Sequence, residues 1–212
     1  MKFQELKDKI EKFVKEELYS LEPWIYSCEW NEKLPKLNEL REKVKKIGLW
    51  LPQISTDYGG IGLSLEEHGE ISEILGGSPY GFYVFNCQAP DAGNMEILIE
   101  VGTSQQKTDY LIPLLEGKTR SCFAMTEPGY AGSNPTRMGT VAKKENGNYI
   151  INGHKWFTSS FDGADFAIVM VVTDPDHKNP YKRASQIIVP TKSKGVKFIR
   201  NVSIMGHPGG GW

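Results

Sequence analysis

The periodicity of apolar residues changes once along this chain of 212 residues, near Thr119. Before that point apolar residues recur every three or four positions, which is the spacing of one helix face. After it the chain reads as short apolar runs separated by turn residues, which is typical of β-strands. A helical block followed by a β block predicts segregated layers and not a βαβ fold. We therefore expect an α+β chain, with an all-helical domain over 1–119 and a β domain over 120–212.

Two amphipathic patterns open the helical block. The apolar positions of residues 3–18 share one helix face, and this helix should end or kink at Pro23 because proline disfavours helical geometry in the residue before it. The apolar positions of residues 37–47 predict a second helix, with Gly48 as its C-terminal cap.

Capping signals predict the later helices. Ser64 with Glu67 three residues on forms a capping box, and that helix should run to Gly76. Two further helices are expected over 92–101 and 104–115, the second of them capped by Thr103-Ser104.

The β block contains a hairpin signal between two apolar runs. Ser121–Met125 is strand-like, and Asn146-Gly147 separates Gly139–Lys144 from Tyr149–Ile151 as a two-residue hairpin turn. The unbroken apolar run Phe166–Thr173 predicts a buried strand.

Three more strands are expected in this block. Asn152-Gly153 is a second turn signal and leads into Lys155–Thr158. Gln186–Val189 and Val196–Ile199 would complete a meander.

Composition excludes several functional classes. Hydrophobic residues make up 39% and charged residues 24% of the chain, which predicts a soluble globular protein. The formal net charge of −1 gives no reason to expect nucleic acid or an anionic membrane as a partner. Residues 1–20 are charged throughout and do not read as a signal peptide, and no apolar run is long enough to span a bilayer.

The cysteines point to a reducing compartment. Cys28, Cys87 and Cys122 are odd in number and far apart, which argues against a disulfide framework and a zinc site. The cytoplasm is the simplest location, or the mitochondrion in a eukaryote.

The first segment with chemical character is Cys122–Ser133. A strand runs into a loop that contains Thr126, Gly129, Gly132 and Ser133. Backbone N–H groups of such a loop can converge on an anion, and its glycines permit close approach of a cofactor. An ordinary connecting loop would also have this composition.

The second segment is Gly153–Ser160, with an aromatic pair beside hydroxyls. If it is a strand, Trp156 and Thr158 point to one face, which suits a flat, hydrogen-bonding ring. A core tryptophan beside a capping threonine is the alternative.

Three segments together resemble the flavin-domain signature of the acyl-CoA dehydrogenase family, both in their order along the chain and in the number of residues between them. They are Phe123–Pro128, Tyr149–Gly153 and Lys155–Thr158. The helical block agrees, since Tyr58–Ser64 resembles that family's loop before a long helix. Motifs of the long-chain-type members are matched by Ala89–Glu96, Gln106-Lys107 and Leu111–Gly117.

The resemblance implies that the β domain over 120–212 is an incomplete antiparallel β-barrel or sandwich of acyl-CoA dehydrogenase type. It also implies FAD as cofactor. Phe123–Thr126 would lie along the pyrimidine side of the ring, where backbone amides and the Thr126 hydroxyl stabilise negative charge on the reduced flavin. Ser133 would touch the FAD diphosphate and lie near the bound acyl-CoA, so that it also binds substrate. Trp156 would pack beside the ring and Thr158 would lie near its hydride-accepting nitrogen. The implied cofactor contacts are Phe123, Ala124, Met125, Thr126, Gly132, Ser133, Trp156, Phe157 and Thr158. One departure is Tyr130, an extra residue in the loop relative to many members.

The implied reaction is α,β-dehydrogenation of an acyl-CoA thioester in fatty-acid metabolism. The family's base is a glutamate of a C-terminal helical domain, whereas this sequence ends at Gly206–Trp212, so we expect no catalytic residue in this chain. That domain, in the same or another chain, would be a partner. An electron-transfer flavoprotein would accept the electrons, and the complete protein would be a homo-oligomer.

Two other functions fit the same residues. The chain could be a non-catalytic module that binds flavin or acyl-CoA, or part of a related flavin oxidase or monooxygenase. Two groups of polar residues are expected to be solvated and without a metal: Glu66, Glu67, Glu70, Glu73 on one helix, and His68, His154, His177, His207 along the chain.

Overall fold

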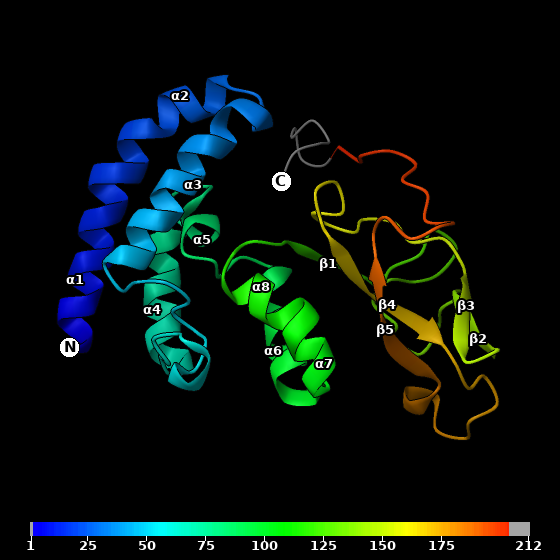
Figure 1. Cartoon of the computed structure of the whole chain (residues 1–212). Helices are drawn as coiled ribbons and strands as arrows, with labels where there is room; N and C mark the ends of the chain where they lie inside the picture. The colour runs from blue at the N-terminus through cyan, green and yellow to red at the C-terminus, as the bar shows by residue number, and fades with distance from the viewer. Residues whose placement is uncertain (1, 204–212) are drawn as a thin grey trace. The chain divides into compact units, whose positions relative to one another are not determined.

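The computed structural model describes residues 2–203, which form two compact units (Figure 1). The first unit ends at Lys118 and the second begins at Thr119. Helices α1 to α8 belong to the first unit, and strands β1 to β5 belong to the second. The expected order of a helical domain followed by a sheet is confirmed. Two features discussed above, His207 and the segment Gly206–Trp212, lie outside the described residues.

The N-terminal helix continues past the predicted interruption. Helix α1 (Phe3–Phe13) passes through a π-helical turn (Val14–Leu18) and a 3₁₀ turn (Tyr19–Leu21) into α2 (Glu22–Ser27). Pro23 lies in the first turn of α2, where a backbone N–H would have no partner within the helix. The proline therefore opens a helical segment after a change of helical form.

The next two helices begin and end where capping residues predict. Helix α3 (Trp30–Lys46) is followed by Gly48, whose φ of +73° suits glycine. Helix α4 (Leu65–Leu75) starts with the predicted capping box. The Glu67 amide donates to Ser64 Oγ at 3.2 Å, and the Ser64 amide donates to Glu67 Oε2 at 2.9 Å.

The end of the first unit has more breaks than the apolar pattern predicts. Thr103 caps its helix as expected, but the segment 104–115 consists of three successive pieces. A short helix that the sequence did not indicate precedes them. The elements are α5 (Gly81–Val84), α6 (Asp91–Val101), α7 (Ser104–Gln106), a π-helical turn (Lys107–Leu111) and α8 (Ile112–Leu115).

The core of the first unit is apolar and shared among its helices. Helix α1 packs against α4, α3 against α5, and α6 against α8. The side chains that meet there have no solvent exposure: Ile10, Val14, Leu18, Leu37, Leu40, Val44, Ile71, Leu75, Val84 and Phe85. None of the described helices combines the length and apolar character that a membrane span requires.

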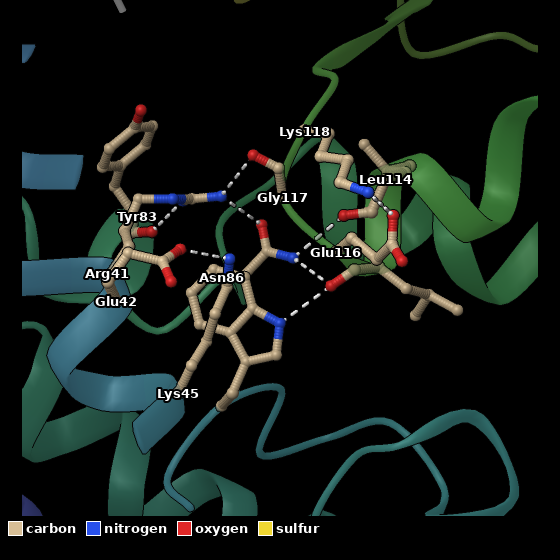
Figure 2. Close-up of polar contacts among 11 residues, drawn as sticks. Arg41, Glu42, Lys45, Tyr83, Asn86, Leu114, Glu116, Gly117 and Lys118 are labelled. Carbon is tan, nitrogen blue, oxygen red and sulfur yellow. Dashed lines mark hydrogen bonds and ion pairs between the residues drawn. The ribbon is translucent and has the colours of Figure 1, made fainter. Parts of the chain in front are cut away.

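A buried cation ties the end of α8 to the rest of this unit (Figure 2). The Arg41 guanidinium lies 4.8 Å from the ring centre of Trp50 and 4.5 Å from that of Tyr83. It donates to the carbonyl of Tyr83 and, at 3.2 Å, to Asn86 Oδ1. Asn86 Nδ2 donates at 3.1 Å to the Leu114 carbonyl in the last turn of α8, which also accepts the Gly117 amide at 3.0 Å.

The second unit is built around one central strand. Strand β4 (Phe166–Val172) pairs in parallel with β1 (Ser121–Ala124) and in antiparallel fashion with β5 (Ala184–Pro190). Within the described residues the sheet does not close on itself. The parallel pair departs from the predicted meander, because the apolar runs identify strands but not their direction.

The predicted hairpin is confirmed. Strands β2 (Val141–Glu145) and β3 (Asn148–Asn152) pair in antiparallel register across Asn146 and Gly147. Both turn residues have positive φ, +50° and +82°, as the tightest hairpin turns require. The hairpin meets β4 through one register pair, Val141 with Val172.

Two predicted strands are wrong. Lys155–Thr158 and Val196–Ile199 have no strand structure. In the first case the Trp156 amide bonds to the Thr126 carbonyl in a neighbouring loop, and Phe157 has a φ of +49°, which no strand accommodates. Trp156 and Thr158 therefore cannot be assigned to one face by strand alternation.

Candidate functional site

The two segments singled out in the sequence lie against each other in the second unit. The Trp156 amide donates to the Thr126 carbonyl at 3.1 Å, and Thr126 Oγ1 donates to the Trp156 carbonyl at 2.8 Å. These two bonds join the loop after β1 to the segment after β3. Because the second bond uses the hydroxyl proton, the Thr126 oxygen keeps only lone pairs for a ligand.

A buried ion pair lies beside this junction. Glu127 is 4% exposed, and its Oε1 lies 2.8 Å from Lys155 Nζ. The carboxylate also accepts the amides of Gly139, at 2.5 Å, and Thr140, at 2.9 Å. Lys155 Nζ donates in addition to the Met125 carbonyl at 2.8 Å. The pair thus fastens both segments to the beginning of β2.

The surroundings of Glu127 keep it ionised. Burial alone would raise its pKa, but the hydrogen bonds from Lys155, Gly139 and Thr140 outweigh burial and lower the pKa from 4.5 to about 2. For Lys155, burial lowers the pKa and the attraction of Glu127 opposes that effect. A carboxylate with three donors is a fixed anion and not a proton acceptor at neutral pH.

Two aromatic rings stand at the surface beside the junction. Trp156 is 38% exposed and Phe157 is 51% exposed, and their ring centres lie 4.9 Å apart. The φ of +49° at Phe157 is unfavourable for a bulky side chain, by roughly 1–2 kcal/mol. Strain of this kind concentrates at ligand sites, and an exposed aromatic pair is a surface on which a flat ring can stack.

The glycine-containing loop is open and locally constrained. Gly132 and Ser133 are exposed, and a Cβ on Gly132 would lie 3.1 Å from Thr126 Cγ2. The extra residue Tyr130 lies over Gly139, where a Cβ would come within 2.6 Å of the tyrosine ring. A side chain at position 139 would therefore require the Tyr130 ring to move.

The other predicted contacts lie on β1 or just beyond the aromatic pair. Phe123 is half-buried and Ala124 is buried in β1, so their backbone is the part nearest to a ligand. Met125 and Thr158 are half-buried. The structure thus brings Thr126 and Trp156 together directly, whereas Ser133 lies further along the loop.

Some of the polar residues that were expected to be solvated form ion pairs or hydrogen bonds, or are partly buried. Glu70 pairs with Lys7 at 2.5 Å, and Glu67 caps α4. His68 is half-buried, against the expected surface position, and burial lowers its pKa while Glu96 opposes this. Among the described residues no cluster of potential metal ligands occurs.

A groove of the first unit has a different character, and Figure 2 shows several of the polar residues that line it, among them Arg41, Lys45 and Lys118. It measures about 700 Å³ and contains none of the predicted site residues. Lys45 pairs with Glu42 at 2.6 Å and Lys118 pairs with Glu116 at 2.8 Å, so its lysines are already neutralised. Arg41 adds one further positive charge to the lining, and its guanidinium donates to carbonyl and amide oxygens of the same unit.

Glu127 and Lys155 were missed as site residues when only the sequence was considered. A signal was present, since one charged residue directly follows Thr126 and another directly precedes Trp156. Charged residues usually lie at the surface, however, and only the fold shows that these two meet in the interior.

Comparison with known proteins agrees with this arrangement. Residues 2–118 match the family model "Acyl-CoA dehydrogenase, N-terminal domain", and residues 122–211 match "Acyl-CoA dehydrogenase, middle domain". The chain is 40% identical to acyl-CoA dehydrogenase family member 10 of Mus musculus, over 98% of this chain and 21% of that protein. It is also 40% identical to family member 11 of Gallus gallus, over 97% of this chain and 27% of the relative.

Solved structures show the same fold. A Mycobacterium abscessus protein described as an acyl-CoA dehydrogenase superposes with a TM-score of 0.89 at 34% identity, over 96% of this chain and 54% of that one. A glutaryl-CoA dehydrogenase of Mycobacterium smegmatis in complex with FADH2 superposes with a TM-score of 0.68 at 25% identity, over 91% of this chain and 46% of that one. The chain thus spans about a quarter of those two curated relatives and about half of these solved chains. It belongs to the acyl-CoA dehydrogenase family.

Proposed function

We propose that this chain forms the flavin-facing part of an FAD-dependent acyl-CoA dehydrogenase. The observation that carries the proposal is the junction of Thr126 with Trp156, which places a hydrogen-bonding loop edge next to an exposed aromatic pair. A flat heterocycle with polar atoms along one rim needs both features.

The residues present fit FAD. The backbone of Phe123–Thr126 supplies polar groups for the rim of the ring, and Trp156 with Phe157 supplies aromatic surface. Ser133, exposed in the glycine-containing loop, would contact the diphosphate and the acyl-CoA. FAD when bound would accept the β hydride of the substrate. Two solved relatives support this cofactor, one in complex with FADH2 and one described as "PigA with FAD and proline".

The reaction we propose is removal of two hydrogens from adjacent carbons of an acyl-CoA thioester. The chain's own residues bind and orient the ring and exclude water from one of its faces. We assign none of the described residues as the base that removes the α proton, because Glu127 is committed to three donors. The base, the helical bundle that carries it and an electron-transfer flavoprotein as acceptor remain parts of the proposal.

A flavin oxidase acting on another substrate is the second candidate. The relative named with FAD and proline shares the fold at 25% identity with a TM-score of 0.69, so the fold alone does not specify a thioester. A module that binds flavin without turnover is the third.

One experiment separates these candidates. The chain is titrated with FAD and followed by flavin fluorescence, alone and after co-expression with the C-terminal helical part of a close relative. We expect weak binding by the chain alone, and tight binding with acyl-CoA-dependent dye reduction in the complex. Trp156→Ala should weaken FAD binding, and Tyr149→Ala on β3 is the exposed aromatic control.

The other outcomes are distinct. Turnover of amino acids but not acyl-CoA would favour the oxidase, and FAD binding without any turnover would favour the module. Absence of FAD binding in both samples would contradict the proposal.

A further inference from the structure

The site consists of a junction between two segments and an ion pair formed by the residues next to that junction. Thr126 and Trp156 form the junction, and their immediate neighbours Glu127 and Lys155 form the ion pair. The side chain of Glu127 is 4% exposed and that of Lys155 is 11% exposed, whereas Trp156 is 38% exposed. In each segment, the residue of the junction and the residue of the buried ion pair are therefore neighbours in sequence.

The ammonium of Lys155 acts on one particular peptide group. Its Nζ lies 2.8 Å from the Met125 carbonyl oxygen, and that carbonyl shares its peptide group with the Thr126 N–H. A cation bound to the carbonyl oxygen draws electron density from the amide, which makes the N–H a stronger donor. The Thr126 N–H would thus be strengthened at the position where the proposed ring needs donors.

Glu127 fixes the ammonium in this position. It accepts from Lys155 Nζ at 2.8 Å and from the amides of Gly139 and Thr140, which anchor it to the beginning of β2. Removal of either charge would leave the other buried without its partner, which is costly in a protein interior. The pair therefore behaves as one unit.

We propose that Lys155, held by Glu127, is a positioning residue that orients the Met125–Thr126 peptide group and strengthens its N–H as a donor to the flavin ring. The role in flavin binding rests on the proposed function. The effect on the peptide group does not, because it arises from contacts within the chain.

The first measurement needs no flavin. The full chain is labelled with ¹³C and ¹⁵N, and the Met125 carbonyl carbon and the Thr126 amide are observed by NMR. Lys155→Met removes the charge with little loss of volume, and both resonances should shift toward those of a carbonyl without a cationic donor. Lys155→Arg keeps the positive charge and should return both resonances most of the way to their wild-type positions. A merely structural role for the side chain would not require this return. Lys143→Met, on the exposed face of β2, is the matched control and should move neither resonance.

The second measurement tests the link to the cofactor. FAD titrations followed by flavin fluorescence should show binding that is weaker by about tenfold in Lys155→Met than in the wild type and Lys143→Met. Should Lys155→Met fail to fold, Glu127→Gln and its exposed control Glu145→Gln test whether the ammonium needs its carboxylate partner to keep this position. Unmoved Met125 and Thr126 resonances in a folded Glu127→Gln chain would contradict the holding role of Glu127.

Each outcome has a separate meaning. Unmoved Met125 and Thr126 resonances in a folded Lys155→Met chain would overturn the inference. Shifted resonances with unchanged FAD affinity would overturn the role in flavin binding. Absence of FAD binding both by the wild-type chain and by its complex with the C-terminal helical part would count against the proposed function, and the NMR comparison would still decide whether Lys155 acts on this peptide group.

Discussion

The Glu127 carboxylate accepts three hydrogen bonds while it is almost fully buried. Its pKa is lowered to about 2, so folding favours the ionised form. Such a group stabilises the fold fully above its ordinary pKa, and the contribution disappears as the pH falls through the folded pKa. A pKa near 2 in place of 4.5 corresponds to roughly 3 kcal/mol.

Glu127→Gln should therefore reduce the acid sensitivity of folding. Between pH 4.5 and about 2, the free energy of unfolding of the wild type should fall more steeply than that of the variant. Urea unfolding of both chains across this range measures the difference. Glu145→Gln, an exposed change on β2, should leave the slope as in the wild type. Equal slopes for Glu127→Gln and the wild type would mean that the carboxylate is not held as described.

The backbone conformation of Phe157 leads to a second prediction at the residue scale. Its φ of +49° is one that glycine adopts freely and that a residue with a Cβ does not. Phe157→Gly and Phe157→Ala both remove the ring, but only glycine relieves the strain. We expect the glycine variant to be more stable than the alanine variant by about 1 kcal/mol.

The control for this comparison lies in a regular strand. At Tyr149 on β3 the order should reverse, with glycine less stable than alanine by about 0.5–1 kcal/mol. Thermal unfolding of the four variants measures both differences. A Phe157→Gly chain no more stable than Phe157→Ala would show that this position is not strained.

At the scale of elements, the last helix of the first unit is held by side chains from elsewhere. The Leu114 carbonyl at the end of α8 accepts Asn86 beside the Gly117 amide, and the Leu115 carbonyl accepts Trp50 (Figure 2). Arg41 donates to Asn86 and stacks on Trp50, so its planar fork connects the two donors. A capping arrangement of this kind depends on residues far apart in sequence.

Arg41→Lys should therefore destabilise the first unit although it keeps the charge. Lysine cannot reproduce the planar stacking or the several directed bonds, and we expect a loss of about 2 kcal/mol. Urea unfolding followed by tryptophan fluorescence measures this, since Trp50 lies in the network. Lys46→Met at the end of α3 is an exposed control, and an equal effect of both changes would contradict the capping role.

The sheet shows which element-scale features the sequence carries. The Asn146-Gly147 turn and the capping boxes at Ser64 and Thr103 were predicted correctly, because they are formed by residues within four positions of one another. The parallel pairing of β1 with β4 was not, since it joins residues about 45 positions apart. Strand direction depends on contacts that no local pattern records.

At the scale of the molecule, the second unit has a sheet that is open within the described residues. Strand β5 has β4 as its partner along one edge, and an unpaired edge can pair with another chain. We expect the isolated chain to self-associate as its concentration rises.

Sedimentation velocity over a range of concentrations measures this self-association. Gln186→Lys adds a charge to an exposed position of β5 and should reduce association without changing the free energy of unfolding. Lys192→Gln, in the turn that follows, is a control of similar size in which a charge is lost instead. A single monomer peak at every concentration would contradict the prediction.

The sequence by itself determined the order of a helical and a β domain, most caps and turns, and the two segments that resemble a flavin site. These features depend on periodicity and on residues close together in the chain. Only the tertiary structure decided that Lys155–Thr158 is not a strand and that its neighbour Thr126 bonds to Trp156. It also decided that Glu127 and Lys155 meet in the interior, because the balance between burial and ion pairing exists only once distant segments are packed together.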